Sequence, residues 1–160
     1  MSCPLCDSPG GTLLWQDDFC RVVRADEPEY PGFLRVILNA HIREMSDLSP
    51  ADQQALMHVV FAAEAALREV MAPDKVNLAS LGNVVPHLHW HVVPRFSDDP
   101  HFPNPVWGAK LRDTPHAAPG DLDARLTAEL HSQGVGRGSK DAEASRTTLS
   151  RRLARVRGTE

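Results

Sequence analysis

The sequence predicts an α+β domain built on a mostly antiparallel sheet. Three observations support this prediction: short strand-like segments near the start, one long amphipathic helix in the middle, and two more strand-like segments after it. The chain has 160 residues, of which 42% are hydrophobic. That length and composition fit one domain with a hydrophobic core and exclude global disorder.

The strand predictions rest on runs of β-branched and aromatic residues bounded by turn signals. Asp17 and Asp18 form a turn-like pair between the first two of these runs. The five predicted strands cover residues 12–16, 19–24, 32–39, 75–80 and 88–93.

The long helix is predicted over residues 50–71. Ser49 is a favourable N-cap, Pro50 suits the first helical position, and Asp52 lies in the first turn, where the helix dipole favours an acid. Apolar residues then recur at three- and four-residue steps and give one apolar face: Leu56, Val59, Val60, Ala63, Leu67 and Val70. A second, shorter helix is predicted over residues 121–131.

Charge divides the chain into unlike parts. Residues 1–131 carry 10 basic and 18 acidic side chains, a net charge of −8, whereas residues 132–160 carry 7 and 3, a net charge of +4. We therefore expect a main domain over residues 1–113, a helical extension over 114–131 and a polar, basic, flexible tail over 132–160. The alternative for the tail is a contact with nucleic acid or another acidic partner.

Composition also excludes several classes of protein. No apolar run approaches the roughly 20 residues of a membrane helix, and the first residues have neither a basic start nor an apolar core typical of a secretory signal. The acidic total argues against a general nucleic-acid binder. We expect a cytoplasmic protein.

Three histidines alternate with apolar residues at positions 87–91. In a strand, alternate side chains share a face, so His87, His89 and His91 are predicted to line one side of the sheet. Three imidazoles together are hard to explain as packing, because each buried ring needs a polar partner. Such a row can bind a metal, or it can perform nucleophilic and acid–base chemistry.

The run His87-Leu88-His89-Trp90-His91-Val92-Val93 resembles the signature of the histidine triad (HIT) family, and Pro94-Arg95 extends the match. Residues 36–42 resemble the family's strand-to-loop segment before its long helix. Residues 77–83 resemble its nucleotide-contacting strand and loop. The resemblance spans roughly residues 3–107.

This resemblance implies a HIT-like homodimer that shares a continuous sheet. It also implies a nucleotide hydrolase or nucleotidyl transferase that cleaves at the α-phosphorus of a dinucleoside polyphosphate or nucleoside phosphoramidate. By the same resemblance, His89 is the nucleophile that becomes nucleotidylated, and His91 hydrogen-bonds the phosphate or assists the leaving group.

The nucleotide contacts implied by the resemblance are Asp26 at the ribose hydroxyls, Asn77 near the sugar and phosphate, and Asn83 in the phosphate loop, together with His89 and His91. Many members of the family have Ser or Thr where this chain has Val84, which offers no hydroxyl.

Cys3 and Cys6 form a C-x2-C pair, and Cys20 is left over as an expected buried strand residue. Zinc fits this pair better than a disulfide, because two thiolates supply half of a tetrahedral site that histidines can complete. The resemblance implies Cys3, Cys6, His41 and His87 as ligands of a structural Zn²⁺ with no open position.

Two other functions remain open from the sequence. One is a metallohydrolase in which His87, His89 and His91 hold a catalytic zinc. The other is a non-catalytic nucleotide-binding protein whose basic tail is the working part. Trp107 is interpreted as a packing residue, with a cover over the site or contact with a dimer partner as the alternative.

Overall fold

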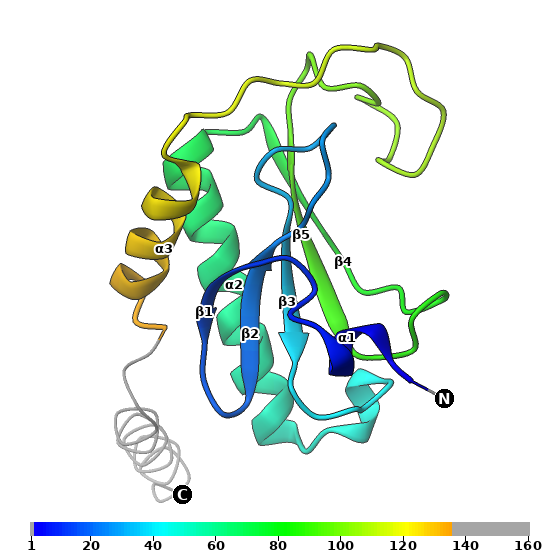
Figure 1. Ribbon diagram of the computed structural model, residues 1–160, viewed down its shortest axis with the longest axis vertical. Coiled ribbons are helices and arrows are strands. Elements are labelled where there is room, and N and C mark those ends of the chain that lie inside the picture. Colours follow the sequence, from blue (N-terminus) through cyan, green and yellow to red (C-terminus); the bar gives the residue numbers. More distant parts are fainter. Residues whose placement is uncertain (1, 136–160) are drawn as a thin grey trace, which may run out of the picture.

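The computed structural model describes residues 2–135 (Figure 1). Two helices and a five-stranded sheet form the body of the molecule, and a one-turn helix lies near the N-terminus. Along the chain the elements are α1 (Pro4–Asp7), β1 (Thr12–Gln16), β2 (Cys20–Arg24), β3 (Leu34–Leu38), a 3-10 turn η1 (Met45–Asp47), α2 (Pro50–Met71), β4 (Lys75–Ala79), β5 (His89–Arg95) and α3 (Leu122–Ser132).

The sheet is antiparallel throughout, with strand order β1-β2-β3-β5-β4. This confirms the predicted α+β class and mostly antiparallel sheet. The turn between β1 and β2 forms as expected, because Asp17 Oδ1 accepts hydrogen bonds from the backbone N–H groups of Phe19 and Cys20. Strand β5 lies between β3 and β4, so its side chains are flanked on both sides.

Helix α2 has the predicted limits. Ser49 Oγ accepts a hydrogen bond from the backbone N–H of Asp52 at 3.2 Å, and Pro50 opens the first turn. The helix ends at Met71. Its C-cap residue Ala72 has a left-handed backbone (φ 47°), which turns the chain away, and the N–H of Ala72 bonds the carbonyl of Arg68.

One face of the sheet packs on α2 and forms the main core. Val22, Val36 and Val92 from three neighbouring strands are fully buried there, against Leu56 and Leu67 of the helix. Helix α3 lies beside α2 (Figure 1) and adds Leu122, Leu126 and Leu130 to the same core.

The predicted boundary between the main domain and the helical extension at residue 113 stays a prediction. Residues 136–160 of the predicted tail lie outside the described residues.

Strand β5 differs from the prediction in a way that matters for the histidines. Pairing with β3 begins at His89, opposite Ile37, so His87 precedes the strand. His87 therefore lies just outside the strand, and strand alternation places only His89 and His91 on one face. Its neighbours explain the difference: the backbone N–H of Leu88 bonds the carbonyl of Ile42, and the ring of His87 is fully buried.

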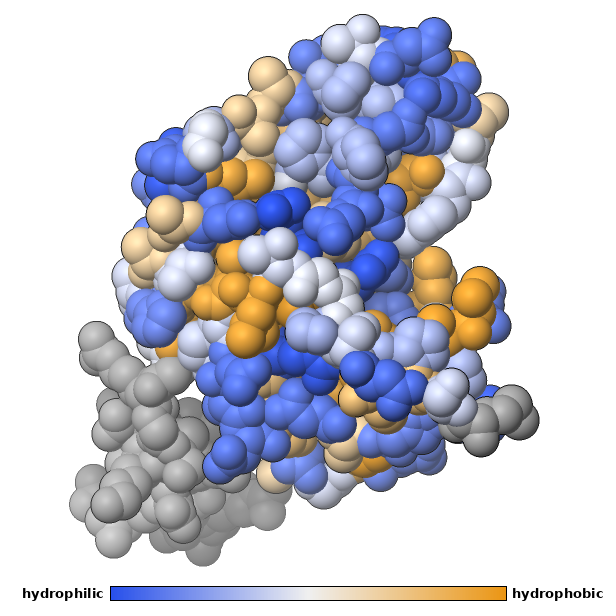
Figure 2. Space-filling view, viewed as in Figure 1, coloured by the Kyte–Doolittle hydropathy of each residue, from blue (hydrophilic) through white to orange (hydrophobic). Residues whose placement is uncertain are grey.

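The visible surface is mostly polar, with apolar groups dispersed between polar ones (Figure 2). One apolar group projects at the right-hand edge, where Figure 1 places the loop between β4 and β5. That loop carries Leu81 and the almost fully exposed Val84. Among residues 2–135, no helix combines the length and apolar character needed to cross a membrane.

The burial of α2 gives a test of the core. Leu56→Ala removes a fully buried side chain and should lower the free energy of unfolding by about 2–5 kcal/mol. Phe61→Ala on the same helix is the control, because Phe61 is 55% exposed and its loss should cost about 0.5 kcal/mol or less. Urea denaturation at fixed protein concentration measures both. Equal losses would contradict this description of the core.

Candidate active site and metal centre

His89 and His91 lie on the face of the sheet opposite α2. Alternation along β5 points both rings to this side and sends Trp90 and Val92 to the other. Their ring centroids are 4.8 Å apart, and both side chains are buried. The predicted pairing of these two histidines on one face is therefore present.

The tautomer of His89 follows from a single contact. Its Nδ1 lies 2.6 Å from the backbone carbonyl oxygen of His87. A carbonyl oxygen can only accept, so Nδ1–H donates and the lone pair of the neutral ring lies on Nε2. The hydroxyl of Ser80 donates to the backbone oxygen of His89 at 2.9 Å and holds the main chain from the β4 side. Nε2 of His89 is thus a fixed nucleophilic nitrogen.

His91 is held neutral by its surroundings. Burial lowers its pKa to about 4, and the nearby charges of His89 and Arg35 act in the same direction. Within the part of the chain that the structure describes, its Nδ1 is buried without a hydrogen-bond partner. A neutral ring beside His89 can donate one hydrogen bond to a phosphoryl oxygen without adding a buried positive charge.

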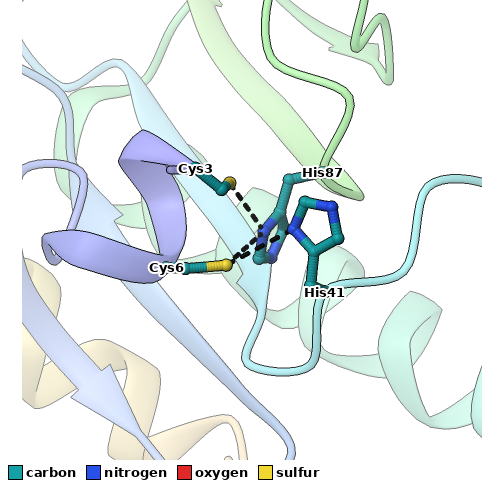
Figure 3. Close-up of side chains that lie close together, drawn as sticks. All are labelled: Cys3, Cys6, His41 and His87. Atoms are coloured by element: carbon teal, nitrogen blue, oxygen red, sulfur yellow. Dashed lines mark hydrogen bonds between the residues drawn. The ribbon is translucent and has the colours of Figure 1, made fainter. Parts of the chain in front are cut away.

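His87 belongs to a second group with Cys3, Cys6 and His41 (Figure 3). One ligand atom from each of the four lies within 4.8 Å of the others, and the side chains point toward a common centre. Cys3 Sγ lies 3.4 Å from His87 Nδ1, and Cys6 Sγ lies 3.4 Å from His41 Nδ1. The group can hold a metal ion.

The hydrogen bonding of His87 fits this use. Its Nε2 lies 2.6 Å from the carbonyl oxygen of Leu38, so Nε2–H donates and the Nδ1 lone pair faces the two sulfurs. The third cysteine is separate. Cys20 is fully buried, as predicted, and burial raises its thiol pKa to about 12, which keeps it protonated and unreactive.

Arg21 holds the cysteine segment in place, a role that the sequence did not reveal. Its guanidinium donates to the carbonyl oxygens of Leu5, Ser8 and Pro9 and to the side-chain oxygen of Asn39. Among the described residues, no carboxylate forms an ion pair with it. Arg21 therefore fixes the backbone segment that carries the two cysteines.

The predicted nucleotide contacts lie at different places around the histidines. Asn77 is paired with Val93 across β4 and β5, so its side chain shares the face of His89 and His91. Asp26 is exposed, two residues beyond the end of β2, and Asn83 is exposed in the loop between β4 and β5. The structure thus brings Asn77 to the histidine face, whereas Asp26 and Asn83 lie exposed in loops outside the strands.

Asn77 is oriented by a buried ion pair that sequence reasoning missed. Arg95 Nη1 donates to Asn77 Oδ1 at 2.8 Å, which leaves the amide nitrogen of Asn77 as a donor. The same guanidinium pairs with Asp99 at 2.8 Å, and both side chains are almost fully buried. Asp99 also accepts from three backbone N–H groups and from the hydroxyl of Tyr30.

Two further residues flank His91 on this face. Arg35 pairs with His91 in the β3–β5 register and donates to Glu27 at 3.1 Å and to the carbonyl oxygen of Gly10. Trp107 lies edge-on to the His91 ring at 5.4 Å and is 57% exposed. The indole therefore packs on His91 with one edge while most of its surface stays exposed, and it forms part of the surroundings of the histidines. No periodicity in the sequence marks either residue.

Comparisons with known proteins agree with this geometry. A HIT domain model matches residues 10–98. AP-4-A phosphorylases from two strains of Mycobacterium tuberculosis are 32% identical over 98 residues, which cover 54% of this chain and 50% of theirs. The chain therefore spans about half the length of the curated relatives it matches.

Solved structures give the same result. A histidine triad protein from Bradyrhizobium japonicum is 28% identical, with a TM-score of 0.63 over 78% of this chain and 91% of that one. Another from Marinobacter aquaeolei VT8 is 29% identical, with a TM-score of 0.61 over 78% and 89%.

The Asp99 cluster predicts a pH dependence of stability. Burial alone raises the pKa of a carboxyl group, but the hydrogen bonds from Arg95 and from backbone N–H groups outweigh it and lower the pKa of Asp99 to about 2. A lowered pKa in the folded protein means that the ionised carboxylate of Asp99 stabilises the folded state relative to the unfolded state. This stabilisation is present above the usual pKa near 3.8 and is lost as the pH falls through about 2.

We therefore expect Asp99→Asn to be less stable than the wild type near neutral pH, with the difference narrowing as the pH falls from about 5 toward 2. Asp98→Asn is the control, because the Asp98 side chain is 67% exposed and should change little at any pH. Urea titrations at several pH values measure the difference. A gap that stays constant with pH would rule out ionised Asp99 as its source.

Proposed function

This chain belongs to the HIT-domain family, and we propose that it cleaves at the α-phosphorus of a dinucleoside polyphosphate or a nucleoside phosphoramidate through a nucleotidyl-histidine intermediate. The observation that supports this most is the fixed tautomer of His89. An imidazole whose Nδ1–H is held by a carbonyl presents its lone pair at Nε2 when the ring is neutral. A serine hydroxyl would need a separate base.

The proposed reaction has two displacements at phosphorus. In the first, Nε2 of His89 forms a bond to the α-phosphorus while the bond to the leaving phosphate or amine breaks, and a leaving amine takes up a proton from the solvent. In the second, water attacks the same phosphorus and gives up a proton to the solvent, the P–N bond to His89 breaks, and the nucleoside monophosphate leaves. The proton on Nδ1 stays on that nitrogen throughout, hydrogen-bonded to the carbonyl oxygen of His87. Two smaller barriers thus replace one large barrier.

Neighbouring donors stabilise the charge that develops on the phosphoryl oxygens. We assign this role to the N–H of neutral His91 and to the amide nitrogen of Asn77. Asp26 is proposed at the ribose hydroxyls and Asn83 at the phosphate. The net charge of residues 1–131 is −8, so binding of an anionic nucleotide depends on such local donors rather than on the overall field.

The acceptor in the second step decides between hydrolase and transferase. The name of the Mycobacterium tuberculosis relatives is that of a phosphorylase, so inorganic phosphate is the natural competitor of water. We propose hydrolysis for this chain. Turnover measured with and without inorganic phosphate separates the two, because phosphorolysis requires phosphate and yields a nucleoside diphosphate in place of the monophosphate.

We infer that the metal held by Cys3, Cys6, His41 and His87 is a structural Zn²⁺. Tetrahedral zinc places sulfur and nitrogen ligands about 3.5 Å apart, and the sulfur-to-nitrogen distances here are 3.4 and 3.5 Å. Four protein ligands close the coordination sphere, so the ion would order the site and activate no water. The grouping of His87 with the cysteines disfavours the alternative in which His87, His89 and His91 hold a catalytic zinc.

A second copy of the chain is the proposed protein partner. Strands β1 and β4 are the edges of the sheet within the described residues, and a shared continuous sheet would extend one of them. The non-catalytic alternative assigns the work to residues 132–160, most of which lie outside the described part of the chain.

The central test is His89→Ala. It should abolish turnover of diadenosine polyphosphate and of a nucleoside phosphoramidate, because no other group can form the covalent intermediate. His58→Ala, an exposed histidine of α2, is the control and should keep the wild-type rate. Labelled nucleotide should be trapped on the wild-type chain and not on His89→Ala. Full activity of His89→Ala would refute the mechanism.

Loss of the metal should be visible without any activity measurement. Cys6→Ser should lower the bound zinc from one ion per chain to well below one and lower the melting temperature, because the ion stabilises only the folded chain. Cys20→Ala, which removes the cysteine outside the group, should keep its zinc. Metal analysis together with thermal unfolding measures both effects. Equal zinc content in all three proteins would disprove the assignment of the ligands.

A further inference from the structure

Trp107 lies beside the triad with most of its surface open. It is at the third position of a turn in which the backbone N–H of Gly108 bonds the carbonyl of Pro105, and its indole lies edge-on to His91. An indole that is 57% exposed leaves a large apolar surface in water. Such a surface next to a reactive histidine suggests a ligand that covers it.

The chain around Trp107 is held firmly, although it has no regular secondary structure. Arg95 donates to the carbonyl oxygen of Asn104 at 2.7 Å, and the Asn104 side chain donates to the carbonyl oxygen of Ala109 at 2.9 Å. Arg112 donates to the carbonyl oxygens of Phe102 and Asp99. The position of the indole is therefore set by the core and is available before any ligand arrives.

The packing of Val106 shows which part of the molecule this segment contacts. Its side chain packs against a small buried cluster formed by Ala25, Tyr30, Phe33 and Val93. Ala25 directly precedes Asp26, the residue proposed to hold the ribose. The segment that carries Trp107 thus packs next to the residue proposed to bind the sugar of a nucleotide. The indole contacts the ring of His91, which in turn contacts the ring of His89.

We propose that Trp107 stacks on the base of the nucleotide whose α-phosphate lies at His89, which makes it a specificity-determining residue; this inference rests on the proposed function. Stacking uses the flat face that every base has, so it favours an aromatic base over none and discriminates weakly among bases. Purines, with the larger face, gain more than pyrimidines. The site therefore recognises 5′-nucleotides as a class.

The test compares two ligands that differ only in the base. Adenosine 5′-monophosphate and ribose 5-phosphate are titrated calorimetrically into the full chain. The wild type should bind the nucleotide at least about fivefold more tightly than the sugar phosphate. Trp107→Ala should bring this ratio close to one and leave the affinity for ribose 5-phosphate unchanged. Trp107→Phe, which keeps an aromatic face, should retain most of the preference.

Leu111→Ala is the matched control, because Leu111 is 54% exposed and lies in the same segment. It should keep the wild-type ratio. If Trp107→Ala keeps the preference for the nucleotide, or if Leu111→Ala loses it equally, the inference is wrong while the proposed function stands. If the wild type itself shows no preference for the nucleotide over the sugar phosphate, the inference and the nucleotide function fail together.

Discussion

The organisation of this site depends on His87, which serves both groups of functional residues. Its side chain donates from Nε2 to Leu38 and presents Nδ1 to the two cysteines, while its backbone oxygen fixes the tautomer of His89. The position of one residue therefore sets the geometry of the Cys3, Cys6, His41 and His87 group and the orientation of the His89 ring. A displacement of the His87 backbone would disturb both together, because within residues 2–135 no other group bonds His89 Nδ1.

The two faces of the sheet carry different kinds of side chain. The face toward α2 is filled with aliphatic residues, and the other face carries the histidines, Asn77 and Arg35. Several polar groups on this second face pair with one another: Arg95 joins Asn77 to Asp99, and Arg35 joins Glu27. Buried polar groups need such partners, and the same partners fix the direction in which each donor points. The order of the site is a consequence of that pairing.

The sequence was informative where a local pattern has a local physical cause. The cap at Ser49 and the apolar spacing of α2 predicted the helix limits, and the alternation around His89 predicted its shared face with His91. Contacts between distant segments left no such pattern. Asp98 and Asp99 are neighbours of the same type, yet only Asp99 is buried, because Arg95 and Tyr30 converge on it. Arg21, Arg35 and Trp107 gain their roles in the same way, through tertiary contacts that no periodicity records.

The hydrogen bonds of Asp99 also bear on the order of assembly. Its partner Tyr30 lies 69 residues earlier in the chain, and Arg95 lies at the end of the last strand. Closing so long a loop costs conformational entropy that a single side-chain contact does not offset, so we expect the sheet to form first and bring these groups together. The segment that carries Trp107 then folds onto an existing surface. Substitutions in that segment can accordingly alter ligand preference with little effect on the formation of the sheet.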